Sequence, residues 1–105
     1  DDVLRVSAAL LRRHCRGIDI VARYGGEEFA LVLPETDLVG ARVVCEKIRL
    51  AFLSHAWGTL APRLMVTISI GICEAQQGMD GGGVFERADA NLYEAKRSGR
   101  DRVVG

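Results

Sequence analysis

The sequence predicts an α+β fold in which three helices pack on a thin, mostly antiparallel sheet. Two apolar runs flank Gly25-Gly26, which predicts a β-hairpin because primed turns need positive φ angles that glycine adopts readily. Three other stretches repeat apolar residues at helical spacing. The chain has 105 residues, a length that suits one domain and leaves no room for a second.

The first expected element is a helix from Asp1 or Asp2, either of which can act as its N-cap, to about Arg16. A broad apolar face at helical spacing supports this helix: Val3, Leu4, Val6, Ala8, Leu10 and Leu11. Residues 18–24 and 28–33 then form the two expected strands of the hairpin.

A second helix is expected over residues 37–53, capped by Thr36 or Asp37, and a loop follows over residues 54–63. Residues 64–73 alternate between the two faces of an extended chain and are rich in β-branched side chains, which predicts a strand.

A flexible, glycine-rich loop is expected over residues 76–83, and a third helix over residues 84–98. Gly99 stands where a left-handed helix cap belongs, and residues 102–104 are expected to add a short closing strand. Three strands and a short fourth make a thin sheet for three helices, so we expect a central strand N-terminal to residue 1.

Charge and composition argue against some classes of function. The chain carries 14 basic and 14 acidic residues, so no global field attracts a nucleic acid polymer or a membrane. No apolar run of transmembrane length and no signal-peptide pattern is found, which leads us to expect a cytoplasmic domain. The cysteines Cys15, Cys45 and Cys73 are far apart, and we expect free, buried thiols.

The hairpin turn carries the most suggestive chemistry. Gly25 and Gly26 leave the tip free of side chains, so a ligand can approach the backbone. Glu27 and Glu28 follow at once, and a carboxylate beside an open turn suits a hard cation such as Mg²⁺. On spacing alone, an ordinary solvated hairpin tip is the preferred interpretation.

Four motifs change that preference. Residues 23–29, RYGGEEF, resemble the RYGG(D/E)EF signature of diguanylate cyclases, the GGDEF domain family, in the variant with two glutamates that active members use. Residues 16–19, RGID, resemble the RxxD inhibitory site that precedes the signature. Residues 66–71 are similar to the family's VTxSIG strand, and residues 88–101 to its ADxALYxAKxxGRN helix end. The order matches across the chain, which is identified as a member of this family.

The resemblance implies a role for each matching residue at the turn. Glu27 would hold Mg²⁺ or Mn²⁺ against the triphosphate of GTP, and Glu28 would assist catalysis or metal binding. Gly25 and Gly26 match the glycines that make room for GTP. Asp1 matches an acidic residue that reads the guanine edge, although helix capping explains Asp1 as well.

Lys96 and Arg100 match the phosphate-binding pair of the family. They are four residues apart across a helix terminus, so both can reach one triphosphate. Without the resemblance, a favourable interaction with the dipole of the helix C-terminus would be the preferred explanation.

Arg16 and Asp19 match the site at which the family binds dimers of its product, cyclic di-GMP, and is inhibited by them. Lys47 stands where a further arginine often assists, and lysine keeps the charge but loses the planar fork. An exposed salt bridge is the alternative for Arg16 and Asp19.

The family pattern also has an N-terminal strand with a DxDxF motif and a helix with a guanine-reading asparagine, and residues 1–105 include neither. We therefore expect the chain to be the C-terminal two-thirds of a GGDEF domain, with half a metal site and no activity alone. The intact parent is expected to be a bacterial signalling enzyme that condenses two GTP into cyclic di-GMP and pyrophosphate as a homodimer, under a sensory or receiver domain. A noncatalytic cyclic di-GMP receptor acting through Arg16 and Asp19, or an interaction domain, remains open.

Overall fold

The computed structural model describes residues 2–25 and 28–105. In chain order, its elements are α1 (Asp2–Arg13), β1 (Ile20–Gly25), β2 (Glu28–Val32), α2 (Leu38–Ser54), the 3₁₀ turn η1 (Trp57–Thr59), β3 (Ile70–Gly71), α3 (Gly81–Arg97) and β4 (Val103–Val104). Three helices and short strands confirm the predicted α+β class. No helix in these two ranges is long and apolar enough to cross a membrane.

The strands of the described residues form two small sheets instead of the single sheet expected from the sequence. β1 pairs with β2 in the predicted antiparallel hairpin, and the ladder is irregular between Arg23 and Gly25. β3 pairs with β4 in parallel, through Ile70 with Val103 and Gly71 with Val104. β3 and β4 can pair in parallel because α3 lies between them in the sequence. The helix returns the chain to the end of the sheet at which β3 began.

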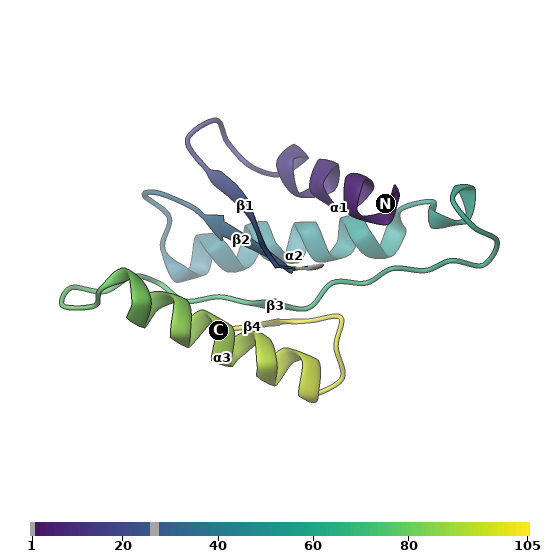
Figure 1. The fold of residues 1–105 in the computed structure, drawn as a ribbon. Coiled ribbons are helices and arrows are strands. Elements are labelled where there is room, and N and C mark those ends of the chain that lie inside the picture. The colour runs from purple at the N-terminus through teal and green to yellow at the C-terminus, as the bar shows by residue number, and fades with distance from the viewer. Residues whose placement is uncertain (1, 26–27) are drawn as a thin grey trace.

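The helices cover the two sides of the parallel pair. α2 contacts β4 and packs against α1, whereas α3 packs on β3 and β4. Figure 1 shows α2 and α3 on opposite sides of the extended segment that contains β3, with α1 and the hairpin on the side of α2.

The core lies where α1, α2 and η1 meet. Its buried members are Leu10, Leu11, Ile48, Phe52 and Trp57. The indole Nε1 of Trp57 donates a hydrogen bond to the Phe52 carbonyl at 2.7 Å, so the buried ring keeps its polar atom satisfied. Phe52 and Trp57 are therefore both anchors of the core.

Two carboxylates cap the start of α2. Asp37, one of the two predicted N-caps, is the N-cap and accepts from the Gly40 amide at 2.8 Å. The Glu74 carboxylate arrives from a distant part of the chain and accepts from the Leu38 amide at 2.6 Å. Both amides would otherwise lack partners at the helix N-terminus.

Several predicted boundaries were wrong for local reasons. α1 ends at Arg13 instead of Arg16, because residues 14–19 form a turn closed by hydrogen bonds between Arg16 and Asp19. α3 begins within the predicted loop, at Gly81, because the Asp80 side chain accepts from the Gly83 amide at 2.7 Å and caps the helix. This N-cap offsets the low helix propensity of the glycines.

The predicted strand over 64–73 was wrong for most of its length. Only Ile70–Gly71 pairs with another strand, and no ladder to residues 65–69 is found in the described ranges. The alternation is real, since Val66 and Ile68 pack against the core while Met65 is 74% exposed. Alternation decides which side chains face inward, but a strand also needs a neighbouring backbone.

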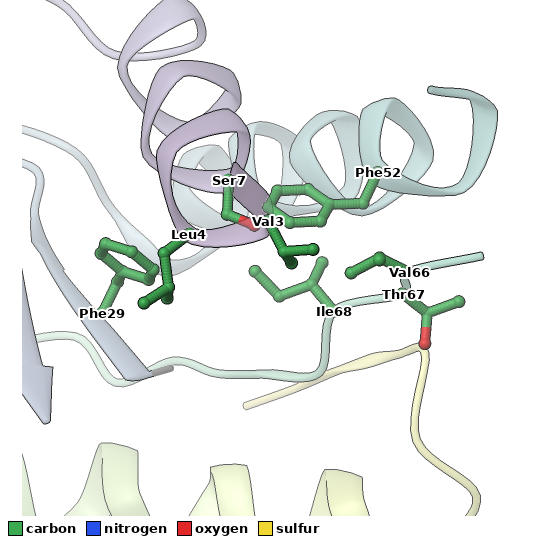
Figure 2. Close-up of a pocket in the computed structure, with 8 residues that line it drawn as sticks. All are labelled: Val3, Leu4, Ser7, Phe29, Phe52, Val66, Thr67 and Ile68. Atoms are coloured by element: carbon green, nitrogen blue, oxygen red, sulfur yellow. The ribbon is translucent and has the colours of Figure 1, made fainter. Parts of the chain in front are cut away.

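An apolar cavity of about 80 Å³ separates β2 from the segment 66–68. Figure 2 shows Leu4 and Phe29 on one side of it, and Val66 and Ile68 on another. Side chains from α1 and the end of α2 complete its wall, namely Val3, Ser7 and Phe52.

Candidate functional site

The two strands of the hairpin pair up to the residues that flank the predicted turn. Gly25 of β1 is in register with Glu28 of β2, so the connection between them is short. Gly26 and Glu27 lie outside the described residues, as does Asp1, and the side chain of Glu28 is not described. The roles predicted for these residues therefore stay predictions.

Arg16 and Asp19 lie together as an ion pair. The Arg16 guanidinium donates to Asp19 Oδ1 at 2.8 Å through Nη2 and at 3.2 Å through Nε, and the Arg16 amide donates to Oδ2 at 2.6 Å. Asp19 is nearly inaccessible, with 3% of its side chain exposed, whereas half of the Arg16 side chain is exposed. The structure thus contains the salt bridge that was the alternative, with an exposed arginine and a shielded carboxylate.

Arg16 also ties its turn to the β2–α2 connection. Its Nη2 donates to the Pro34 carbonyl at 2.7 Å and to Thr36 Oγ1 at 2.8 Å. The hydrogen bonds from Arg16 hold the pKa of the Asp19 carboxyl below its usual range. Lys47, the third predicted member of this site, is exposed on α2.

Lys96 and Arg100 both lie at the C-terminal end of α3. Lys96 is half-buried in the last turn of the helix, and Arg100 is exposed in the turn that follows. The Arg100 amide donates to the Ala95 carbonyl at 2.9 Å, which folds the turn back onto the helix. Gly99 has a φ of 134°, as expected for a glycine that ends a helix.

The turn after α3 has supports that sequence reasoning missed. Arg49 of α2 donates to Asp101 Oδ1 at 3.0 Å, and the Asp101 amide donates to Ser69 Oγ at 3.1 Å. Ser69 and Asp101 lie within motifs, but nothing in the motifs pairs them. The sequence gives only a weak signal that Arg49 contacts this turn. Glu46, three residues before Arg49, suggests instead an ordinary ion pair on the helix surface.

Metal-binding side chains do not cluster elsewhere in the described ranges, where no group of three or more His, Cys, Asp or Glu could hold an ion. His55 instead caps the end of α2 and stacks edge-on against Trp57, with ring centroids 4.6 Å apart. The carboxylate of Glu27 has the oxygen chemistry that Mg²⁺ and Mn²⁺ prefer, which fits the half of a metal site expected from the sequence.

Comparison with known families agrees with this fold and these motifs. The family model described as "Diguanylate cyclase, GGDEF domain" matches residues 1–102. The chain belongs to the GGDEF domain family.

The curated relatives are diguanylate cyclases and a response regulator. The chain is 43% identical to diguanylate cyclase DgcP of Pseudomonas aeruginosa over 103 residues, covering 98% of the chain and 15% of DgcP. It is 42% identical to the response regulator PleD of Caulobacter vibrioides over 108 residues, covering all of the chain and 24% of PleD. The chain thus spans a quarter or less of the length of these relatives.

Solved structures share the fold. The GGDEF domain of DgcB from Caulobacter crescentus, in complex with c-di-GMP, superposes with a TM-score of 0.90 at 37% identity, covering 98% of this chain and 62% of that one. The active GGEEF domain of a diguanylate cyclase from Vibrio cholerae gives 0.89 at 30% identity, with 99% and 66% coverage. Diguanylate cyclase SiaD of Pseudomonas aeruginosa, solved with its activator SiaC, gives 0.87 at 39% identity, with 98% and 40% coverage.

Proposed function

We propose that residues 1–105 serve as part of one GGDEF domain in a diguanylate cyclase, which condenses two GTP into cyclic di-GMP and two pyrophosphates as a homodimer. The observation that carries the proposal is the end of α3, where the half-buried Lys96 lies in the last helical turn and the exposed Arg100 lies in the tightly held turn that follows. Membership of the family and the intact GGEEF sequence support the same activity.

Each residue of the proposed site has a defined task. Lys96 and Arg100 bind the triphosphate, and Asp1 accepts hydrogen bonds from guanine N1 and N2. Gly25 and Gly26 let the nucleotide approach the hairpin backbone. Each domain holds one GTP, and the 3′-hydroxyl of each GTP attacks the α-phosphate of the other, so two domains must face each other.

Glu27 would hold the divalent cation, Mg²⁺ or Mn²⁺, and Glu28 would assist catalysis or metal binding. When bound, this ion would neutralise charge on the phosphates and favour ionisation of the attacking hydroxyl. The proposed domain works in the cytoplasm, where GTP is available, and a sensory or receiver domain in the same protein controls its pairing.

A second candidate is a cyclic di-GMP receptor that works through Arg16 and Asp19. The half-exposed Arg16 guanidinium favours it, since a guanidinium fork suits phosphate and guanine edges. The Asp19 carboxylate already accepts from the Arg16 amide and guanidinium, so a ligand has to compete with internal hydrogen bonds for it.

One assay separates the two candidates. The full-length protein is incubated with GTP and Mg²⁺, and cyclic di-GMP is measured by chromatography, together with its binding by calorimetry. The cyclase proposal expects product from the wild type and none from Glu28→Gln. A wild type that makes no product, yet binds cyclic di-GMP until Arg16→Ala is introduced, would overturn it in favour of the receptor.

A further inference from the structure

The turn after α3 has an unusual backbone. Gly99, Arg100 and Asp101 have φ angles of 134°, 62° and 45° in succession. Positive φ is unfavourable for residues with a Cβ atom, so two adjacent ones need support from their surroundings. Such strained positions gather at sites that bind or react.

Short-range contacts fold this turn tightly. The Arg100 amide donates to the Ala95 carbonyl at 2.9 Å, and Arg102 Nε donates to the Arg100 carbonyl at 2.9 Å. A residue with a Cβ atom would be strained at the Gly99 φ of 134°, so glycine is favoured there. These contacts restrain Arg100 from both sides along the chain.

Contacts from distant elements fix the turn in place. Arg49 Nη1 donates to Asp101 Oδ1 at 3.0 Å, and Ser69 Oγ accepts from the Asp101 amide at 3.1 Å. We call Arg49, Ser69 and Asp101 the turn clamp. It joins α2 and the segment before β3 to the residue that follows Arg100.

Arg49 is well suited to hold a fixed position. Only 18% of its side chain is exposed, and its Nε donates to both carboxylate oxygens of Glu46 at 3.0 Å. The neighbouring Ile48 is fully buried in the core. The Arg49 guanidinium is thus held between two carboxylates, and Arg49 belongs to a helix that packs into the core. A rigid support of this kind is what holds a binding residue in a fixed position.

We propose that Arg49 is a positioning residue: through Asp101 it holds the strained turn in the conformation that presents Arg100, beside Lys96, to the phosphates of a bound nucleotide. The proposal rests on the proposed function for the identity of that nucleotide as GTP. It assigns to Arg49 an effect on binding that acts only through Arg100.

The test uses the full-length protein and the variants Arg49→Met, Arg100→Ala and the double variant. We expect Arg49→Met to raise the KM for GTP about tenfold, with a smaller change in kcat. In the Arg100→Ala background, Arg49→Met should leave KM unchanged while still lowering Tm, because the two residues act as one unit. Arg42→Met, an exposed arginine on the same helix, is the matched control and should leave KM unchanged.

A second pair of variants covers the case in which Arg49→Met does not fold. Asp101→Asn keeps an oxygen that accepts from Arg49 and should keep KM near the wild-type value, whereas Asp101→Ala should raise it. An unchanged KM in Arg49→Met or Asp101→Ala, or equal effects with and without Arg100, would overturn the proposal.

A failure of the cyclase proposal is separable from a failure of this one. If the wild type makes no cyclic di-GMP, the same variants are compared by their Kd for inorganic tripolyphosphate. The same non-additive pattern in Kd supports the turn clamp, and no difference between wild type and Arg49→Met overturns it.

Discussion

Gly71 of β3 lies so close to α3 that a Cβ atom on it would stand 2.1 Å from the backbone nitrogen of Leu92. The same atom would lie 2.3 Å from the Ala88 carbonyl oxygen. Beside this contact, Asn91 Nδ2 donates to the Ile72 carbonyl at 2.8 Å. The glycine that ends the VTISIG motif is therefore required for the approach of helix to strand, which sets the position of the helix that carries Lys96.

Gly71→Ala should lower the free energy of unfolding by about 2 kcal/mol or more, because backbone atoms cannot move aside for the new methyl group. Urea unfolding followed by circular dichroism measures it. The matched control is Gly58→Ala, since nothing lies within 4 Å of a Cβ atom at Gly58. An equal effect of both substitutions would contradict the close approach.

Acid should weaken the fold through Asp19. Hydrogen bonds from Arg16 lower the pKa of Asp19 in the folded protein. As the pH falls, the Asp19 carboxyl therefore binds a proton at a higher pH in the unfolded chain than in the folded protein. The ion pair stabilises the fold fully above the ordinary pKa of aspartate, and this stabilisation is lost as the pH drops through the lower pKa of Asp19 in the folded protein.

Arg16→Ala should remove this part of the pH dependence of the free energy of unfolding between about pH 5 and pH 2. Chemical denaturation at a series of pH values measures it, with the exposed Arg87→Ala on α3 as control. If the free energy of unfolding of Arg16→Ala depends on pH as steeply as that of the wild type, Arg16 does not lower the pKa of Asp19.

The thiol of Cys45 should be inert in the native protein. Burial raises its pKa to about 11, so almost no thiolate forms at pH 8. A short iodoacetamide pulse followed by mass spectrometry should leave Cys45 unmodified in the folded protein and label it after unfolding. Because the folded pKa is raised, stability should also fall as the pH rises from about 9 towards 11. Rapid native labelling of Cys45 at pH 8 would contradict its burial.

Trp57 offers a test of the core. Trp57→Phe keeps an aromatic ring but removes the 2.7 Å hydrogen bond to the Phe52 carbonyl, which still accepts from the His55 amide at 3.3 Å, and should lower the free energy of unfolding by about 0.5–1.5 kcal/mol. Trp57→Ala also removes the ring packed at 5.9 Å from Phe52 and should cost about 3–5 kcal/mol. Circular dichroism in urea gives both values, and equal losses would show that ring packing contributes little.

Local signals predict the hairpin, the helices and the Asp37 cap, because apolar spacing and turn chemistry act over a few residues. α2 begins and ends within a residue of its predicted bounds. Residues 64–69 show where such signals fail: their alternation sets which side chains face inward, but strand pairing depends on a distant backbone.

The candidate site was predictable in its motifs but not in its supports. Arg16 and Asp19 are three residues apart, so their ion pair is a local contact of the kind that the salt-bridge alternative predicted. Arg49 and Asp101 are 52 residues apart, and only the folded chain brings them within hydrogen-bonding distance.

The most direct test of the central claim is the steady-state kinetics of cyclic di-GMP formation by the full-length protein carrying Lys96→Ala or Arg100→Ala. Loss of one charge-assisted contact to phosphate should raise the KM for GTP at least about tenfold. The control is Arg97→Ala, because Arg97 lies between Lys96 and Arg100 in the sequence and forms an exposed ion pair with Glu94 at 3.6 Å. The KM for GTP of this variant should match the wild type. KM values that stay at the wild-type level in Lys96→Ala and Arg100→Ala would contradict the assignment of a phosphate site to the end of α3.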